Sequence, residues 1–368
     1  MKIIFDNIIF SLQNSGGISV VWYELLKRIT NNKDFEIEYL EYNKGINNIF
    51  RKDLIINNNL IIKKSSFIFS LKRYLNPSLI TKKETFIFHS SYYRTSSNKN
   101  AINITTVHDF IYEKYGNGIS KKVHIYQKYN ALKKSDVIIC ISENTKKDLL
   151  DLYPDIEKSK IHVVYNGVSN DYSPNLIKST VSLPYNQKEY IIFVGNRKGY
   201  KRFDIAVAVA AELNLKLVIV GGGNLSKNEI ELLNSTIYKD NYKHLERLSN
   251  KELNILYGNA LCLLYPSYYE GFGLPVLEAQ KSGCPVVAFS GSSVKEIAGE
   301  TPLLFDEYSI NKISNIIKKF LFNDETRNQI IQNGFVNVER YSWDSTYSKI
   351  ISIYKKSFEN YKIKKMMK

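Results

Sequence analysis

The chain has few cysteines, no long hydrophobic run and a shortage of acidic residues. Its cysteines, Cys140, Cys262 and Cys284, are widely spaced and form no Cys-x-x-Cys pair. We therefore expect neither a zinc site nor a disulfide framework, and a reducing cytosol fits. No apolar stretch approaches the roughly 20 residues that span a bilayer. Asp6 and Asn7 interrupt the one candidate leader segment, which is more typical of a first buried strand.

Two further absences concern metal ions and cofactors. The chain has no Asp-x-Asp motif, and its five histidines do not cluster with carboxylates at the spacing of metal ligands. We therefore expect no metal ion and no cofactor. An anionic ligand would then have to be bound by basic side chains and backbone N–H groups.

The scarce acids leave a formal net charge of +15, which is unevenly distributed. Residues Ile49–Lys134 contain 16 Lys and Arg against 4 Asp and Glu, and Lys349–Lys368 contain 7 Lys against one Glu. Such a charge attracts nucleic acid, an anionic membrane leaflet or a phosphorylated acceptor, although a solvated lysine-rich surface explains it equally well. No nucleic-acid-binding module accompanies the charge, so we expect no nucleic acid partner.

Short β-rich runs alternate with longer amphipathic ones, as in parallel α/β proteins. A polar stretch, Asn166–Lys188, separates two such series, which predicts an N-terminal domain over residues 1–172 and a second domain over 188–343. Residues 43–82 are poorly periodic. Two doubly wound, Rossmann-like halves predict a deep cleft between the carboxyl ends of two sheets, where ligands bind in such folds.

The predicted elements follow the hydrophobic periodicity. We expect strands at Ile3–Phe5, Phe35–Leu40, Thr85–His89, Ile102–Val107, Asp136–Ile141, Ile161–Val164, Tyr190–Val194, Lys216–Val220, Leu261–Tyr265 and Pro285–Ala288. We expect helices at Ile18–Ile29, Ile119–Lys134, Glu143–Leu150, Phe203–Leu213, Glu229–Tyr238, Lys251–Tyr257 and through most of Ile310–Tyr361.

The most informative run is Pro266–Ala279, which contains two carboxylates eight residues apart, Glu270 and Glu278. A predicted strand precedes the run, and Pro275 suits the first turn of a helix. Gly271 and Gly273 expose backbone amides before that helix, which is a favourable place for an anion. The pattern indicates a site for a phosphorylated, hydroxyl-rich ligand. Without the Gly-Phe-Gly-Leu-Pro between them, an ordinary loop with two solvated glutamates would be the preferred interpretation.

The same run resembles the Glu-x7-Glu signature of the retaining GT-B glycosyltransferases of family 4. In that family the first Glu lies beside the donor sugar and the second holds the ribose of the nucleotide. The resemblance therefore implies that Glu270 contacts the sugar and Glu278 the ribose. It also implies that backbone amides around Phe272, Gly273 and Leu274 face the donor diphosphate.

A basic loop, Phe193–Arg202, follows another predicted strand. A planar guanidinium and a lysine near one another suit a diphosphate. Members of the family place an Arg after the glycine and a Lys about one turn later, which implies diphosphate contacts for Arg197 and Lys201. The local sequence departs from the common family pattern, so Arg202 is a second candidate for the diphosphate contact assigned to Lys201. A solvated basic loop is the alternative.

Two candidate sites lie in the N-terminal half. Gly16 and Gly17 open the first long predicted helix, and the family carries a glycine pair here that faces the donor phosphates. His108 and Asp109 stand at the end of a predicted strand. The resemblance implies that His108 lies against the donor sugar, whereas we expect Asp109 to support the loop. For Gly16 and Gly17 the alternative is an ordinary tight turn, and for His108 it is a structural histidine whose hydrogen bonds are satisfied within the protein.

The resemblance implies a GT-B enzyme with two facing Rossmann-like domains. Tyr341–Asp344 resembles the motif that begins the terminal helix of the family, so we expect a helix over about 344–368 to pack back on the N-terminal domain. The implied reaction is metal-independent transfer of a hexosyl group from a nucleotide diphosphate sugar to a glycan or lipid-linked acceptor, with retention. The expected location is the cytosol, at an anionic membrane face. A nucleotide-sugar epimerase and a non-catalytic sugar-nucleotide-binding protein are the alternatives.

Overall fold

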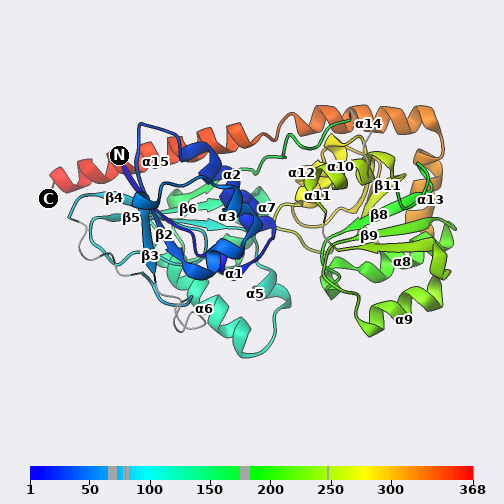
Figure 1. Ribbon diagram of the computed structural model, residues 1–368, viewed down its shortest axis with the longest axis horizontal. Helices are drawn as coiled ribbons and strands as arrows, with labels where there is room; N and C mark the ends of the chain where they lie inside the picture. The colour runs from blue at the N-terminus through cyan, green and yellow to red at the C-terminus, as the bar shows by residue number, and fades with distance from the viewer. Residues whose placement is uncertain (65–72, 78, 80–82, 175–182, 247, 368) are drawn as a thin grey trace. The chain divides into compact units, whose positions relative to one another are not determined.

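The computed structural model describes residues 1–64, 73–77, 79, 83–174, 183–246 and 248–367 of the chain. The chain forms two compact units (Figure 1). The first unit comprises Met1–Asn166 together with Trp343–Lys368, and the second comprises Gly167–Ser342. The predicted separating stretch, Asn166–Lys188, lies partly outside the described residues.

The first unit is built on a parallel sheet of seven strands in the order β3-β2-β1-β4-β5-β6-β7. Its elements are β1 (Lys2–Asp6), α1 (Ile9–Leu12), α2 (Gly17–Ile29), β2 (Glu36–Tyr42), α3 (Ile49–Asp53), β3 (Ile61–Lys64), β4 (Phe86–Ser90), β5 (Ala101–Val107), α5 (Ile111–Tyr115), α6 (Gly118–Lys134), β6 (Val137–Cys140), α7 (Glu143–Leu152), β7 (Ile161–Val163) and α15 (Trp343–Met366), with 3-10 turns at Asn43–Asn47, Asn58–Leu60 and Lys158–Lys160.

The second unit is built on a parallel sheet of six strands in the order β10-β9-β8-β11-β12-β13. Its elements are β8 (Tyr190–Val194), a 3-10 turn (Gly199–Lys201), α8 (Phe203–Glu212), β9 (Lys216–Val220), α9 (Lys227–Thr236), a 3-10 turn (Lys239–Asn241), β10 (Tyr242–Leu245), α10 (Asn250–Asn259), β11 (Cys262–Tyr265), α11 (Leu274–Lys281), β12 (Val286–Phe289), α12 (Val294–Ala298), β13 (Leu304–Phe305), α13 (Ile310–Leu321) and α14 (Asp324–Val338).

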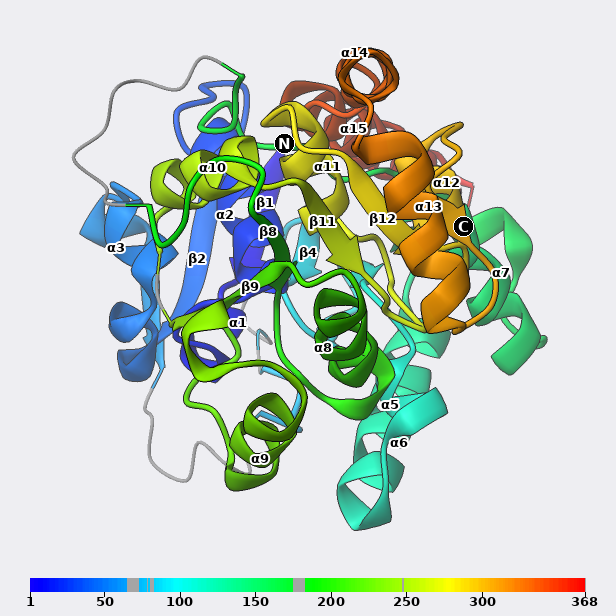
Figure 2. The same cartoon turned by 90° about the vertical axis from the view of Figure 1, so that its right-hand side faces the viewer.

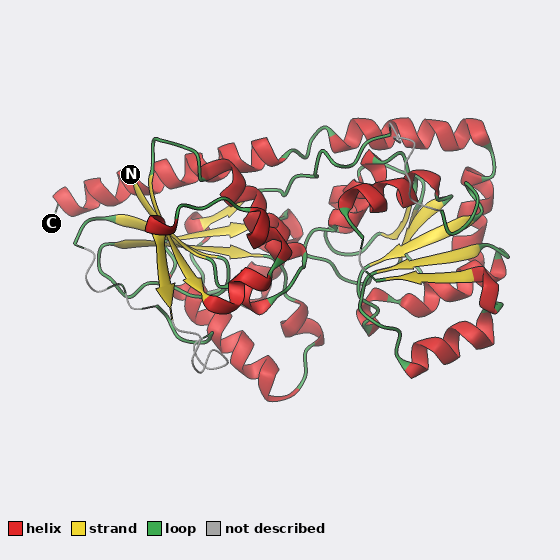
Figure 3. Ribbon diagram, viewed as in Figure 1, coloured by secondary structure: helices red, strands yellow, loops and turns green. Residues whose placement is uncertain are grey.

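Both sheets are buried on both faces, as parallel sheets covered by crossover helices must be. In β1, Ile3 and Phe5 join the core under α2 and α15, whereas Ile4 joins a smaller cluster on the opposite face. In the second unit, Ile191 and Phe193 of β8 point into the core that α8 and α13 close. The layers are visible in Figure 3, where helices flank the strands of each unit. The predicted pair of Rossmann-like α/β folds is therefore confirmed.

The C-terminal helix α15 belongs to the first unit. Its Ile350 and Tyr354 are buried in the core of that unit, and the Tyr354 hydroxyl hydrogen-bonds Nδ1 of His89 on β4. The chain enters the second unit at Gly167, slightly before the predicted domain end at residue 172. Among the described residues, no helix combines the length and apolar composition needed to cross a bilayer.

Candidate active site

The carboxyl ends of β8 and β11 bring together two of the three residues of the second unit that were predicted to take part in catalysis. These strands are parallel neighbours, so the loops that follow them leave the sheet at the same edge. Lys201, in the loop after β8, forms an ion pair with Glu270, in the loop after β11, and both side chains are 10% exposed. The Lys201 ammonium also lies 3.4 Å from the hydroxyl of Tyr265, the last residue of β11. The structure thus places a buried lysine–carboxylate pair at the end of the sheet.

Backbone and serine hydrogen bonds fix the loop that carries Glu270. The N–H of Tyr268 donates to the carbonyl of Tyr200 at 2.7 Å, which joins this loop to the basic loop. The N–H of Glu270 donates to Oγ of Ser292 at 2.9 Å. The hydroxyl of Ser293 donates to the Glu270 carbonyl at 2.9 Å and to the Phe272 carbonyl at 3.0 Å. Sequence reasoning missed both serines, although a polar run at the end of β12 was a usable signal.

The second carboxylate of the run, Glu278, lies on α11. Gly273 precedes this helix with a φ of +101°, a conformation that glycine adopts without strain, and Pro275 occupies the first turn. Glu278 is half-buried beside α10, where the Tyr257 hydroxyl lies 3.5 Å from its Oε2. Tyr172 hydrogen-bonds the same carboxyl group. Sequence reasoning missed both tyrosines.

Burial raises the pKa of the Glu278 carboxyl from 4.5 to about 7, although the hydrogen bonds from Tyr257 and Tyr172 oppose the shift. Tyr172 lies within the predicted N-terminal domain, but the structure places it in the second unit. The Tyr172 hydroxyl lies 3.3 Å from Oδ1 of Asn250, and the backbone N–H of Ser173 donates to Oδ1 of Asn254 at 3.0 Å. Both asparagines are on α10, so the segment after Asn166 helps to build the Glu278 site.

Arg197 lies at the edge of this site, but its donors are used by the chain itself. Its Nε donates to Glu229 at 2.9 Å, and its two terminal nitrogens donate to carbonyls of Gly221–Asn224, the shortest contact being 2.6 Å to Gly221. The side chain is only 2% exposed. Gly222 has a φ of +78°, and a Cβ there would lie 2.4 Å from Arg197. The diphosphate role predicted for Arg197 therefore requires this loop to release the guanidinium.

Arg202 also has partners within the chain. Its guanidinium makes three hydrogen bonds of 2.8–3.2 Å with Asp204 and lies 4.3 Å from the ring centre of Tyr308. Its φ of +48° places it in the left-handed region, just before α8. The side chain remains 32% exposed. Because this ion pair faces water, a phosphate can compete for the arginine more easily than for a buried one.

The remaining predicted donor contacts of the second unit lie around the start of α11. Phe272 is 4% exposed and packs edge-on against Tyr341, with ring centres 6.0 Å apart, so its ring anchors the loop. Leu274 begins the helix, and the N–H of Val276 donates back to the Gly273 carbonyl. Whether the amides of this turn bind a diphosphate stays a prediction.

In the first unit, Gly16 and Gly17 precede and open α2, after the unpredicted short helix α1. A Cβ on Gly16 would lie 2.7 Å from Oε1 of Gln13, whereas a Cβ on Gly17 would meet nothing within 4 Å. The geometry of this turn therefore requires glycine only at Gly16. The space beside Gly17 would admit a phosphate, and the contact of Gly17 with the donor phosphates stays a prediction.

His108 follows β5 and faces a cavity of about 20 Å³ that α2 and α15 also line. Such a volume holds a water molecule and not a sugar ring. Burial, with a contribution from Lys128, lowers the pKa of His108 to about 4, so the imidazole is neutral near pH 7. Asp109 accepts the N–H of Ile111 at 3.0 Å, which confirms that it supports the loop.

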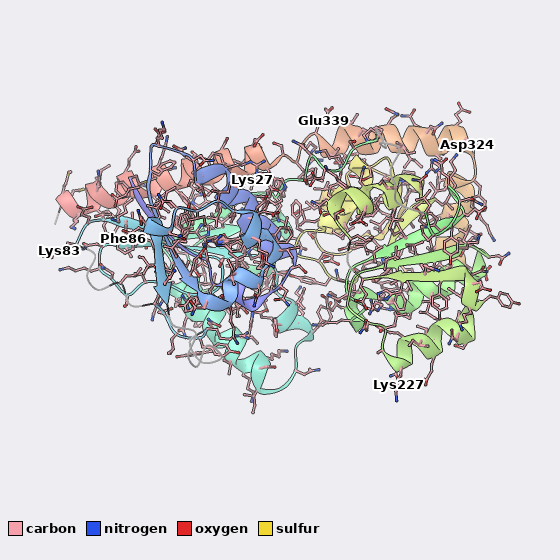
Figure 4. The ribbon with its side chains drawn as sticks, viewed as in Figure 1. Lys27, Lys83, Phe86, Lys227, Asp324 and Glu339 are labelled. Atoms are coloured by element: carbon pink, nitrogen blue, oxygen red, sulfur yellow. The ribbon has the colours of Figure 1, made fainter. Side chains whose placement is uncertain are left out.

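Within the described residues, no three His, Cys, Asp or Glu side chains gather as metal ligands. The candidate site on the second unit consists of the Lys201–Glu270 ion pair, the Glu278 carboxyl group with its two tyrosine partners, and a glycine loop that is hydrogen-bonded to Arg197. Sequence reasoning named most of these charged residues but paired none of them. Side chains are drawn in Figure 4.

Comparisons with known proteins identify the family of the chain. Residues 177–336 match the model of the glycosyl transferases group 1, and residues 15–172 match the model of glycosyltransferase family 4. An O-antigen chain mannosyltransferase B of Escherichia coli is 25% identical over 240 residues, which cover 62% of this chain and 62% of that protein. An uncharacterized glycosyltransferase of Methanocaldococcus jannaschii is 26% identical over 371 residues, 96% of this chain and 98% of that protein. The match thus spans less than two thirds of the first relative and nearly all of the second.

Two solved structures share the fold at low sequence identity. Sucrose-phosphate synthase of Thermosynechococcus elongatus superposes with a TM-score of 0.76 at 18% identity, over 98% of this chain and all of that one. HepE of Anabaena, solved with UDP and glucose, gives a TM-score of 0.69 at 15% identity, over 96% and 99% of the two chains. The two family models together cover most of the chain, and both sheets have the fold of these enzymes. The chain therefore belongs to the glycosyl transferases group 1, within glycosyltransferase family 4.

Proposed function

We propose that the protein transfers a sugar from a nucleotide diphosphate sugar to a hydroxyl of a glycan or lipid-linked acceptor, with retention at the anomeric carbon. The Lys201–Glu270 ion pair at the carboxyl edge of the second sheet is the observation that carries this proposal. Glu278 lies on the helix that follows the same loop. A cation, a carboxylate and a second carboxyl group on adjoining turns suit a ligand with a diphosphate between two polyhydroxylated rings.

The two carboxyl groups have different roles in the proposal. Glu270 accepts hydrogen bonds from the hydroxyls of the donor sugar, and Lys201 meets the negative charge that develops on the departing diphosphate. Glu278 holds the ribose hydroxyls, because its carboxylate has acceptor sites left beyond the hydrogen bonds from Tyr257 and Tyr172. Arg197 acts as a positioning residue for the glycine loop after β9.

A contact between His108 of the first unit and the sugar stays a prediction, because the cavity that His108 faces has room for a water molecule and not for a sugar ring. The imidazole would be neutral in such a contact. The leaving phosphate accepts the proton of the acceptor hydroxyl, so no separate general base is required. The proposed reaction needs no metal ion, since Lys201 and backbone N–H groups meet the diphosphate charge. The acceptor belongs to the synthesis of a cell-surface polysaccharide or lipopolysaccharide, and transfer takes place at the cytosolic membrane face.

A thermal-shift panel of nucleotide sugars is the first experiment. UDP-sugars come first, because HepE was solved with UDP and glucose, and GDP-mannose follows, because the Escherichia coli relative is a mannosyltransferase. The sugar that raises the melting temperature is then tested for transfer in the presence of EDTA, and NMR of the product reads the anomeric configuration. The expected result is transfer with retention in EDTA.

The same assay separates the alternatives. Sugar rearrangement without an acceptor would indicate an epimerase, and binding without turnover by any acceptor tried would indicate a binding protein. Either result would overturn the proposed transfer. Replacement of the pair tests the site: Glu270→Gln and Lys201→Met should both abolish turnover, and full activity in both variants would refute the assignment. The surface variant Glu231→Gln on α9 is the matched control.

A further inference from the structure

Three aromatic side chains lie together at the carboxyl edge of the second sheet. Tyr268 stands in the loop after β11, Phe289 ends β12, and Tyr308 follows β13. Their rings are nearly parallel, since the ring centres lie 4.6–6.2 Å apart and the planes differ by 15–26°. Offset parallel packing is a favourable arrangement for aromatic rings. We refer to these three residues as the aromatic platform.

Contacts within the second unit hold the aromatic platform in place. The Tyr308 hydroxyl donates to the carbonyl of Pro266 at 3.0 Å, which ties the end of β13 to the loop after β11. The ring centre of Phe289 lies 5.9 Å from that of Phe305, which is 4% exposed and belongs to the core. A Cβ on Gly291 would lie 2.4 Å from the Phe289 ring, so the loop after β12 passes close to the platform only because glycine is there.

One end of the aromatic platform is open to solvent. Tyr268 is 52% exposed, whereas its neighbours in the chain, Ser267 and Tyr269, are 1% and 3% exposed. Phe289 and Tyr308 are partly buried. The loop thus turns a single tyrosine outward and buries the residues on either side of it. An exposed tyrosine that other rings hold in place offers a ligand contact area at little entropic cost.

The surroundings of the platform are polar and include acids, in a chain with a net charge of +15. Arg202 lies 4.3 Å from the ring centre of Tyr308, but its charge is paired with Asp204, which is 52% exposed. Asp306, directly after β13, is also exposed. Carboxylates accept hydrogen bonds from hydroxyl groups and repel phosphates. The platform therefore favours a neutral ligand rich in hydroxyl groups.

A sugar ring meets both requirements. The C–H groups on one face of a pyranose carry a slight positive charge and pack on the negative face of an aromatic ring. The hydroxyl groups at its rim then reach the carboxylates of Asp204 and Asp306. Aromatic surface with a few polar groups at its edge is the usual composition of a small-molecule site.

The order of strands separates the platform from the nucleotide part of the proposed donor site. Arg197, after β8, holds the glycine loop after β9, on one side of the Lys201–Glu270 pair. The platform lies on the other side, because the sheet continues from β11 to β12 and β13 (Figure 2). Tyr268 is two residues from Glu270, and two residues of chain span at most about 7 Å. A ring on the platform would thus lie next to the donor sugar and away from the nucleotide.

We propose that the aromatic platform is a subsite for a neutral sugar ring of the acceptor, which is therefore a glycan. The apolar face of the ring packs on Tyr268, and its hydroxyl groups bond to the acids beside the platform. Assignment of the ring to the acceptor rests on the proposed function, whereas the binding of a sugar ring at Tyr268 can be measured without donor or turnover.

Saturation-transfer NMR of the full chain tests the subsite with two neutral probes, methyl α-D-glucopyranoside and methyl α-D-mannopyranoside. At least one probe should receive saturation at its ring C–H protons. Tyr268→Ala should weaken binding of that probe about three- to tenfold, and Tyr268→Leu should do the same because it lacks the aromatic face. Tyr268→Trp should retain binding. Absence of a wild-type signal with both probes, or an equal affinity in Tyr268→Ala, would overturn the proposal.

Two further variants locate the bound probe. Tyr238→Ala removes another tyrosine of the same unit, 83% exposed, and should bind the probe like the wild type. Glu270→Gln should also bind it, because the probe occupies the platform and not the proposed donor-sugar position. A signal that Glu270→Gln loses and Tyr268→Ala keeps would place the probe at the donor-sugar position and refute the subsite.

The transfer assay then assigns the ring to the acceptor. Tyr268→Ala should raise the KM for the acceptor about three- to tenfold and leave the KM for the nucleotide sugar unchanged. A higher KM for the nucleotide sugar alone would place the donor on the platform and contradict the assignment. Probe binding that depends on Tyr268 in a protein without transfer activity would support the sugar subsite and refute only the proposed function. A concentration-dependent dimer that Tyr268→Ala abolishes, with probe signals unchanged, would show self-association instead.

Discussion

Replacement of Glu278 by glutamine should stabilise the protein at neutral pH and leave its stability nearly unchanged in acid. Burial raises the pKa of this carboxyl group from 4.5 to about 7. Between these values the folded chain binds a proton that the unfolded chain has released, so the Glu278 contribution to the free energy of unfolding falls as the pH rises through that window. Above pH 7 the side chain is ionised in both states, and the folded state carries the full cost of a poorly hydrated carboxylate.

The size of the effect follows from the shift. A difference of 4.5 to about 7 corresponds to ~3 kcal/mol at most. Part of Glu278 stays in contact with water, so we expect about half of that or less. The difference in unfolding free energy between Glu278→Gln and the wild type should therefore grow by roughly 1–2 kcal/mol from pH 4.5 to pH 8. Effects of all other titrating groups cancel in this difference.

Urea unfolding followed by far-UV circular dichroism at four or more pH values measures that difference. The spectra report on both units, and the transition that a nucleotide sugar stabilises is expected to be that of the second unit. Glu231→Gln, an exposed replacement on α9 of the same unit, should show a difference independent of pH. A flat profile for Glu278→Gln would refute the raised pKa. A variant less stable than the wild type at pH 8 would show that the tyrosine hydrogen bonds outweigh burial.

Four further replacements test contacts in the same unit. Lys201→Met and Glu270→Gln should each destabilise the second unit in urea unfolding, by roughly 2–4 kcal/mol where a buried charge is left alone, and the double variant should recover part of the loss. A fully additive double variant would argue against the ion pair. Gly222→Ala should displace the guanidinium of Arg197 and weaken binding of the nucleotide sugar in calorimetry; unchanged affinity would separate the glycine loop from the donor site. Ser293→Ala should cost about 1–3 kcal/mol in urea unfolding and lower turnover, since it leaves two loop carbonyls without their donor. Unchanged stability of Ser293→Ala would mean that the loop that carries Glu270 keeps its conformation without the serine hydrogen bonds.

The fold was predictable because hydrophobic periodicity and the order of elements suffice for a parallel α/β protein. The strands β8 (Tyr190–Val194) and β9 (Lys216–Val220) have the predicted bounds, because both are short, mainly apolar runs that end at a glycine. The edge strands β3, β10 and β13 were missed. The sequence of β10, Tyr-Lys-His-Leu, has only one aliphatic residue, so it carries little of the signal that marks a buried strand.

The residues of the candidate site were predictable, but their partners were not. Motifs name residues along the chain, whereas the Lys201–Glu270 pair depends on β8 and β11 being neighbours in the sheet although β9 and β10 lie between them in sequence. Tyr172 is a similar case. It precedes the second series of elements in the sequence, and only its packing against α10 shows that it belongs with Glu278. Spatial order in a sheet with crossovers cannot be derived from periodicity alone.

The most consequential difference concerns the basic loop. Three of its cations were expected to await a diphosphate, yet in the structure these three have carboxylate partners: Arg197 with Glu229, Lys201 with Glu270 and Arg202 with Asp204. A diphosphate that attracts Lys201 must therefore weaken its ion pair with Glu270. That carboxylate then regains acceptor capacity at the place where the donor sugar is proposed to lie, because an ionised carboxylate left by its cation accepts hydroxyl hydrogen bonds. Phosphate recognition and sugar recognition would thus be coupled through one ion pair, and free diphosphate should bind without the sugar only at the cost of an uncompensated Glu270. Comparison of the affinities of UDP and a UDP-sugar in the wild type and in Glu270→Gln tests this coupling: the variant should gain affinity for UDP and lose it for the sugar nucleotide.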